Sequence, residues 1–268
     1  MGKSRKSFMI VAAVLAACLV VAAIIVGPRL LKFLPRPTLS SVSDVARIDE
    51  FGNGRFKHLA LVPGISNGRL VVYAHGSSQD ERAIVTEATD ASLAIALVQD
   101  GYTVVSSSAG GNAWGSTASV EDYRNIIKYS RAVYRVQDVY LLAESMGGLP
   151  SLQLLGDPGI KAWAGIYPVC NASTVVSNVD IKAQMDKAYP DAPTYLQDLS
   201  PVAIRTGKPM IFWASHDDAT VPAATNTEAC AADARRAGAS VTVIPTTGNH
   251  GDGSNFEPTR LVEFFNSH

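Results

Sequence analysis

The chain has 268 residues, of which 47% are apolar, and a formal net charge of −1 at pH 7. This length and composition are typical of a globular chain that buries one sizeable core. Because the chain has no basic surplus to neutralise phosphates, nucleic acid is excluded as an expected partner.

The first 27 residues differ in kind from the rest. Lys3, Arg5 and Lys6 precede an uncharged, apolar run from Phe8 to Val26. As a helix, this run would be about 28 Å long, close to the thickness of the hydrocarbon core of a bilayer. It is longer than the apolar part of most cleaved signal peptides. We therefore expect residues 1–27 to be a signal anchor, a transmembrane helix that stays on the protein.

A secreted or lipid-modified form is the alternative for the same segment. Leu15-Ala16-Ala17-Cys18 resembles a bacterial lipoprotein signal, although the run stays apolar beyond Cys18. The Lys and Arg counts on the two sides of the run are equal and do not set its orientation. Since a short basic tail usually stays inside, we expect a single-pass protein of the cell membrane with its bulk outside the cytoplasm.

The remaining chain is predicted to contain a linker and one α/β domain. Residues 28–45 are rich in proline and serine and are expected to be the linker. Within residues 46–268, strand-like and helix-like segments alternate, which predicts a mostly parallel sheet with helices on both faces. The expected strands are 56–62, 69–74, 102–105, 139–142, 160–167, 209–213 and 240–244, and the expected helices are 82–99, 120–136, 225–237 and 258–265. Residues 171–201 break the alternation and are expected to form a small helical, cap-like insertion.

One serine lies between a predicted strand and a predicted helix. In Ala143-Glu144-Ser145-Met146-Gly147, the small residues on either side of Ser145 are what a tight strand-to-helix turn tolerates. Such a turn exposes the serine hydroxyl and directs the N–H of Met146 towards a bound carbonyl oxygen. Ser145 is therefore a candidate nucleophile, and a simple helix cap is the alternative.

Other polar residues follow other predicted strands, where ligands bind in sheets of this type. Asp217 and Asp218 follow one strand, and His250 follows the last. A serine hydroxyl needs a base such as a neutral imidazole, and the imidazole needs a carboxylate on its other nitrogen. An oxyanion needs two N–H donors, for which Met146 and Ser77 are the candidates.

These pieces together resemble the α/β-hydrolases, from about Phe56 to His268. The matching pieces are His75-Gly76, the turn around Ser145, the loop Ser215-His216-Asp217-Asp218-Ala219-Thr220-Val221-Pro222, and Gly248-Asn249-His250. The resemblance implies that Ser145 is the nucleophile, Asp218 the acid and His250 the base, with Ser77 and Met146 forming the oxyanion hole. The family spacing to Val221-Pro222 favours Asp218, with Asp217 as the alternative.

Two departures from the family pattern stand out. Ala143 replaces the usual glycine, and Ser106-Ser107-Ser108 occupies a place where the family often has an acidic or aromatic residue. The first departure is common within the family and has little effect. The second leaves the substrate preference open.

Several further residues have expected roles around the site. Asn112 and Trp114 lie in a glycine-rich loop and are candidates for binding substrate, with a plain surface loop as the alternative. His75 is expected to orient the oxyanion loop, Glu144 to be structural or to line the pocket, and His216 to be a polar loop residue.

Neither a metal nor a cofactor is expected. No His/Cys/Asp cluster has metal-ligand spacing, and no phosphate-binding glycine loop follows the first strand. Cys170 and Cys230 can form one disulfide in an oxidising compartment or remain two buried thiols.

The sequence therefore predicts a membrane-anchored serine hydrolase that acts on a small-molecule or lipid carboxylic ester through an acyl-enzyme on Ser145. Acyl transfer to another hydroxyl and cleavage of peptides or thioesters use the same triad and stay open as alternatives. A hydrolase fold that only binds, without catalysis, is the alternative from another class of protein.

Overall fold

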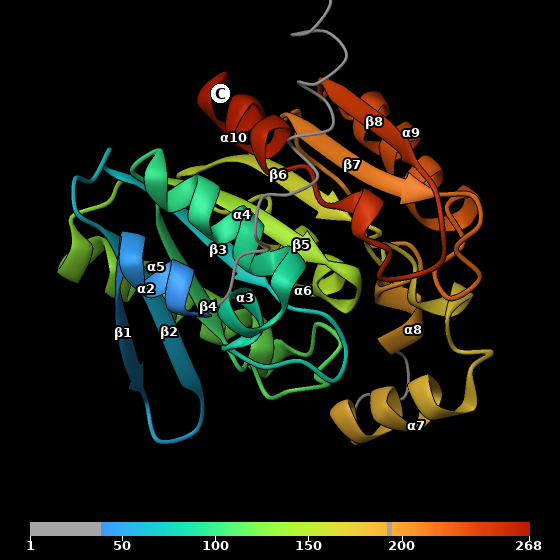
Figure 1. Cartoon of the computed structure of the whole chain (residues 1–268). Helices are drawn as coiled ribbons and strands as arrows, with labels where there is room; N and C mark the ends of the chain where they lie inside the picture. The colour runs from blue at the N-terminus through green and yellow to red at the C-terminus, as the bar shows by residue number, and fades with distance from the viewer. Residues whose placement is uncertain (1–38, 192–194) are drawn as a thin grey trace, which may run out of the picture. The chain divides into compact units, whose positions relative to one another are not determined.

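The protein is described from a computed structural model covering residues 39–191 and 195–268 (Figure 1). The predicted signal anchor and most of the predicted linker lie outside these residues. Within the described part of the chain, no helix combines the length and the apolar character that crossing a bilayer requires.

The described residues contain one eight-stranded sheet with the order β1-β2-β4-β3-β5-β6-β7-β8. Its strands are β1 (Ala46–Gly52), β2 (Lys57–Pro63), β3 (Arg69–Ala74), β4 (Thr103–Ser107), β5 (Asp138–Glu144), β6 (Ile160–Ile166), β7 (Met210–Ser215) and β8 (Val241–Thr246). β2 pairs antiparallel with β1 and with β4, and all the pairs from β4 to β8 are parallel. The predicted mostly parallel sheet is confirmed.

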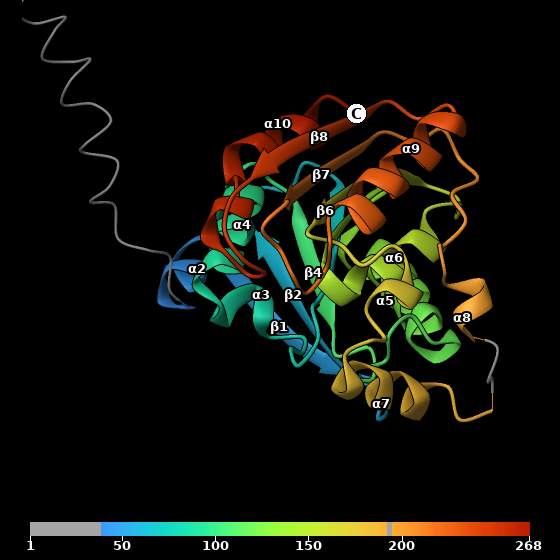
Figure 2. The same ribbon diagram turned by 90° about the vertical axis from the view of Figure 1, so that its right-hand side faces the viewer.

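Helices cover both faces of this sheet (Figure 2). One face carries α2 (Leu39–Val45), α3 (Ala83–Thr86), α4 (Ala88–Gln99) and α10 (Pro258–Asn266), and the other carries α5 (Thr117–Tyr134), α6 (Gly148–Leu154) and α9 (Ala229–Arg236). Successive side chains of a strand point to opposite faces. In β3, Leu70 and Val72 therefore pack in the core with α5 and α6, whereas Val71 and Tyr73 pack in the core with α4.

Regular structure extends into the end of the predicted linker. Residues at the end of the predicted linker 28–45 form α2, and Val42 is fully buried in the core that α4 lines. β1, which the sequence does not predict as a strand, pairs with β2 along its whole length. β1 is an edge strand with partly exposed residues, among them Arg47 and Asp49, so its sequence lacks the apolar run of a central strand.

The predicted insertion of residues 171–201 is helical, as expected. It contains a 3₁₀ turn (Ala172–Thr174), α7 (Val179–Ala188) and α8 (Tyr195–Asp198). α7 begins at a side-chain cap, because the Asn178 amide oxygen accepts hydrogen bonds from the N–H groups of Asp180 and Ile181. The insertion interrupts the chain between β6 and β7, on the carboxyl side of β6.

The turn after β5 is as tight as the small residues around Ser145 predict. Ser145 has a φ of +48°, a conformation that residues with a side chain rarely adopt. A Cβ atom at Gly147 would lie 1.9 Å from the carbonyl oxygen of Ala74 in β3. A Cβ atom at Gly148 would lie 2.4 Å from the carbonyl oxygen of Val169. Glycine is therefore required at both positions for the backbones to pack this closely.

We expect Gly147→Ala to destabilise the protein, because the added methyl group collides with backbone that cannot rotate away. Overpacking of this kind typically costs about 1–3 kcal/mol, and urea unfolding would measure it. Gly156→Ala is the matched control, since an added Cβ there meets nothing within 4 Å. Equal unfolding midpoints for the two variants would contradict the close packing of the turn.

Candidate active site

Ser145, Asp218 and His250 meet at the carboxyl edge of the sheet, after β5, β7 and β8. The Nε2 atom of His250 lies 2.9 Å from the hydroxyl oxygen of Ser145, and its Nδ1 atom lies 2.7 Å from Oδ2 of Asp218. An ionised carboxylate only accepts hydrogen bonds, so Nδ1 carries the proton and Nε2 of the neutral ring accepts from the serine. This arrangement lets the imidazole take the serine proton.

Asp218 is held in place by backbone donors. Its second carboxylate oxygen accepts hydrogen bonds from the N–H groups of Thr220 and Val221, each at 2.9 Å. Burial alone would raise the pKa of Asp218, but the hydrogen bonds from His250 and these N–H groups outweigh burial and lower the pKa below its ordinary value. The carboxyl group is therefore ionised at neutral pH, as the partner of an imidazole must be.

The choice between the two neighbouring aspartates is decided by their orientation. Asp217 is exposed, whereas Asp218 is buried and contacts His250. The neighbouring His216 is exposed and forms an ion pair with Glu228 at 3.0 Å. His216 thus lies where the sequence places it, as a polar loop residue.

The two candidate oxyanion donors, Ser77 and Met146, lie in different loops. Ser77 is in the loop after β3, and Met146 follows Ser145 in the 3₁₀ turn Ser145–Gly147. The amide oxygen of Asn112 accepts hydrogen bonds from the N–H of Ser78 at 2.6 Å and from the hydroxyl of Ser77 at 3.2 Å. Asn112 is not among the residues that line the cavity beside Ser145, and its role in binding substrate stays a prediction. Its side chain holds the loop of Ser77 in place.

Gln184 of α7 ties the insertion to this loop. Its amide oxygen accepts hydrogen bonds from the Ser77 hydroxyl at 3.0 Å and from the indole N–H of Trp114 at 3.1 Å. The sequence offers no signal for this residue, because one polar residue on a short helix is unremarkable. Its role depends on where the insertion folds back over the sheet.

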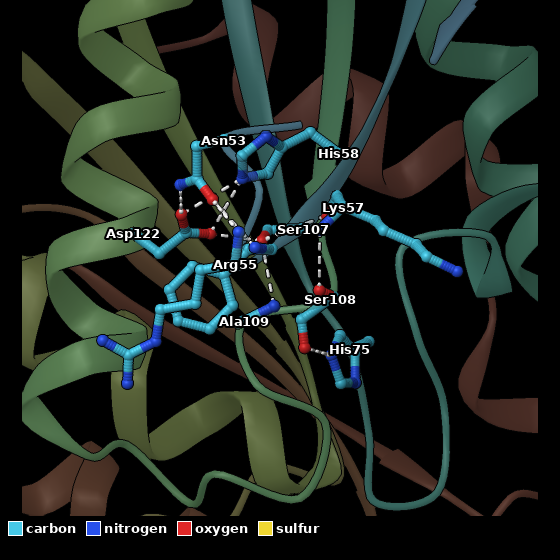
Figure 3. A network of polar contacts seen from close by, with 10 residues as sticks. Asn53, Arg55, Lys57, His58, His75, Ser107, Ser108, Ala109 and Asp122 are labelled. Atoms are coloured by element: carbon cyan, nitrogen blue, oxygen red, sulfur yellow. Dashed lines mark hydrogen bonds and ion pairs between the residues drawn. The ribbon is translucent and has the colours of Figure 1, made fainter. Parts of the chain in front are cut away.

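His75 joins the loop after β3 to the loop after β4 (Figure 3). Its ring nitrogens lie 2.7 Å from the Gly76 carbonyl oxygen and 3.1 Å from the Ser108 carbonyl oxygen. His75 therefore links the loop that carries Ser77 to the loop after β4.

The serines that depart from the family pattern belong to a neighbouring buried network (Figure 3). The Ser107 hydroxyl bonds to the carboxylate of Asp122, which also lies 3.0 Å from Nε2 of His58. The same hydroxyl accepts a hydrogen bond from the N–H of Ala109 at 2.9 Å, and the Ser108 hydroxyl accepts one from the N–H of Lys57 at 3.0 Å. These serines therefore anchor the start of the glycine-rich loop.

A cavity of about 250 Å³ opens beside Ser145 and His250. Trp114 lines it, as predicted, and the insertion contributes Val175 and Ile181. The remaining lining residues are Gly76, Ser77, Gln79, Glu144, Tyr167, Val169, Thr220, Val221 and Gly251. Among the residues that the structure describes, no group of His, Cys, Asp or Glu side chains has the arrangement to hold a metal ion.

Cys170 and Cys230 are both free and buried. Burial, together with the neighbouring Cys230 side chain, raises the pKa of the Cys170 thiol well above its ordinary value. The sequence leaves open a disulfide or two buried thiols, and in the structure these two cysteines are buried thiols.

Asp90 in α4 has a buried carboxyl group next to Glu144, the last residue of β5. This residue is not among those singled out from the sequence. Burial, and then the negative charge of the neighbouring Glu144, raise the pKa of Asp90 well above its ordinary value. Asp90 shares the buried face of α4 with Leu93, Ala94 and Leu97. An acidic residue at helical spacing from apolar ones was the signal that could have identified it.

With this topology, the described part of the chain has the α/β-hydrolase fold. No family model and no curated protein matches the sequence. Solved structures do match, among them an acylaminoacyl peptidase of Pyrococcus horikoshii with a TM-score of 0.64 and 17% identity. That match covers 82% of this chain and 41% of the peptidase, so the chain spans less than half of the peptidase's length.

Two esterases are also similar in structure. An esterase of Pyrococcus furiosus has a TM-score of 0.64 and 14% identity, covering 87% of this chain and 98% of the esterase. A truncated carbohydrate esterase from gut microbiota has a TM-score of 0.63 and 17% identity, covering 78% and 90%. At these identities the likeness establishes the fold.

The raised pKa of Asp90 makes stability depend on pH. Because folding raises this pKa, the folded state holds a proton that the unfolded state releases above about pH 4. The contribution of Asp90 to stability is therefore lost as pH rises towards the raised pKa, by at most about 1.4 kcal/mol per pH unit. We expect Asp90→Asn to gain stability relative to the unmodified chain as pH rises, measured by urea unfolding from pH 5 to 8. Parallel stability curves for the two proteins would contradict this assignment.

Proposed function

We propose that the protein is a serine hydrolase that cleaves carboxylic esters through an acyl-enzyme on Ser145. The observation that carries the proposal is the continuous hydrogen-bond chain from Ser145 through His250 to Asp218, at the rim of a cavity. Each member of the chain has the chemical character that its role requires: an alcohol, a neutral base and a buried carboxylate.

In the first half of the reaction, His250 Nε2 takes the proton of Ser145 as the serine oxygen attacks the ester carbonyl carbon. Asp218 stabilises the imidazolium that results. The negative charge on the former carbonyl oxygen is balanced by the N–H groups of Met146 and Ser77. When the intermediate collapses, the alcohol leaves with the proton from His250, and the acyl group stays on Ser145.

In the second half, water replaces the alcohol. His250 removes a proton from the water as its oxygen attacks the acyl carbon, and the same proton then returns to the oxygen of Ser145 as that oxygen leaves. The acid is released and the starting state is restored. Every proton moves between the substrate, water, Ser145 and His250, so the reaction needs no cofactor.

The cavity favours esters with a short acyl chain. Its volume of about 250 Å³ lies below the range of about 300–1,000 Å³ that is usual for ligand sites. The insertion contributes two apolar side chains, Val175 and Ile181, to its wall. A short apolar group fits such a space better than a long one.

Peptide cleavage is the second candidate, because the same three residues serve it and one similar structure is an acylaminoacyl peptidase. An amine is a poorer leaving group than an alcohol and depends more on proton donation by His250. Paired ester and amide substrates with the same acyl group separate the two activities.

We expect a fluorophosphonate probe to label the native chain and to lose that labelling in Ser145→Ala. The probe reacts with an activated serine, and among the described serines only the hydroxyl of Ser145 is hydrogen-bonded to an imidazole, at 2.9 Å. Ser130→Ala is the control, since its buried hydroxyl has no hydrogen-bond partner among the residues that the structure describes. An unreactive native chain would favour a binding domain without catalysis.

We expect Ile181→Ala to extend the range of acyl chains accepted, because it removes part of the cavity wall. Each extra methylene that fits a pocket is worth about 1–3 kcal/mol. The ratio of kcat/KM for an octanoyl ester to that for a butyryl ester should therefore rise about tenfold or more. Val179→Ala is the matched control, on the same helix but exposed and outside the cavity. An unchanged ratio for Ile181→Ala would mean that this wall does not contact the acyl chain.

A further inference from the structure

Glu144, the last residue of β5, has a carboxylate on which three donors converge. The hydroxyl of Tyr73 donates to it at 2.5 Å, the hydroxyl of Tyr167 at 2.7 Å and the amide nitrogen of Gln79 at 3.3 Å. The residue is 6% exposed. A buried carboxylate is stable only when it is surrounded by donors in this way.

One of these contacts leads to the catalytic base. The ring of Tyr167 packs against the ring of His250, with 4.4 Å between the ring centroids. Tyr167 has a φ of +35°, which a residue with a side chain adopts only when its surroundings hold it there. Its hydroxyl bond to Glu144 and the bond from its N–H to the carbonyl oxygen of Trp213, at 2.8 Å, supply that hold.

A second contact leads to the oxyanion loop. The amide oxygen of Gln79 accepts a hydrogen bond from the N–H of Gly76 at 2.6 Å, while its amide nitrogen donates to Glu144. Gly76 directly precedes Ser77. The orientation of the Gln79 amide, and with it the position of the loop, is therefore set by the carboxylate of Glu144.

The third link is covalent, because Ser145 follows Glu144 in the chain. Asp90 lies behind Glu144, and its carboxyl group holds a proton under conditions in which exposed carboxyl groups are ionised. Because two adjacent buried carboxylates would repel each other, the proton that Asp90 retains lets the two side chains lie next to each other.

We propose that Glu144 is the positioning residue of this site, which aligns His250 through Tyr167 and the oxyanion loop through Gln79 with the serine that follows it. The inference rests on the proposed hydrolase function for its kinetic consequences. Its structural consequence, that the base and the loop move together when Glu144 changes, is independent of any activity.

The test compares Glu144→Gln, Tyr167→Phe and the double variant in the full chain. Tyr167→Phe removes one hydroxyl and keeps the ring against His250. Tyr140→Phe is the matched control, since Tyr140 is an equally buried tyrosine that packs against Tyr102 and Phe265 instead. The measurements are kcat and KM for a butyryl ester, and the NMR signals of the His250 Nδ1 proton and the Gly76 amide proton.

We expect kcat to fall about 10- to 100-fold in both single variants, with KM nearly unchanged, because misplaced catalytic groups slow the chemical step. The double variant should be no slower than Glu144→Gln, since the Tyr167 hydroxyl acts only through Glu144. Both NMR signals should shift in Glu144→Gln, the His250 signal alone in Tyr167→Phe, and neither in Tyr140→Phe.

Unchanged NMR signals in Glu144→Gln, or losses of kcat that simply add in the double variant, would overturn the inference. A loss of stability without a change in kcat would do the same, because it would mark Glu144 as structural only. If the native chain has no hydrolase activity and yet both NMR signals shift in Glu144→Gln, the proposed function fails and the positioning inference is supported.

Discussion

The close packing of the turn at Ser145 against β3 is the constraint on which the rest of the site depends. Gly147 approaches the carbonyl group of Ala74 so closely that no side chain fits between them. Ala74 ends the strand from which the loop of Gly76 and Ser77 leaves the sheet. One backbone contact therefore places both the candidate nucleophile and the second candidate oxyanion donor, and it leaves Ser145 in a conformation that directs its hydroxyl out of the sheet.

Two buried carboxylates hold the loops around this turn from different directions. Glu144, at the end of β5, supports His250 through Tyr167 and the loop of Gly76 through Gln79. Asp122, bonded to His58 and Ser107, supports the start of the loop after β4. Each accepts several hydrogen bonds, so that neither leaves a buried charge without partners. Exposed pairs such as Lys182 with Asp186 are solvated instead and contribute little rigidity.

The insertion between β6 and β7 has a different role from the sheet. It supplies apolar cavity wall through Ile181 and reaches the oxyanion loop through Gln184. The sheet edge can thus carry the same chemistry in many proteins while a short inserted segment shapes the space for the acyl group. Under the proposed function, changes in substrate choice should arise mainly in this segment.

The pattern of apolar runs and small residues by itself determined the alternating strands and helices, the turn at Ser145 and the order of serine, aspartate and histidine after their strands. These features follow from local sterics and from the rule that parallel strands end at one edge. Only the tertiary structure decided that Asp218 and not Asp217 faces His250, that Asn112 holds a loop, and that Asp90 lies behind Glu144. Those outcomes depend on which side chains distant segments turn inward. The spacing to Val221-Pro222 only favours Asp218, and the helical spacing around Asp90 indicates a buried face without naming the residue that it contacts.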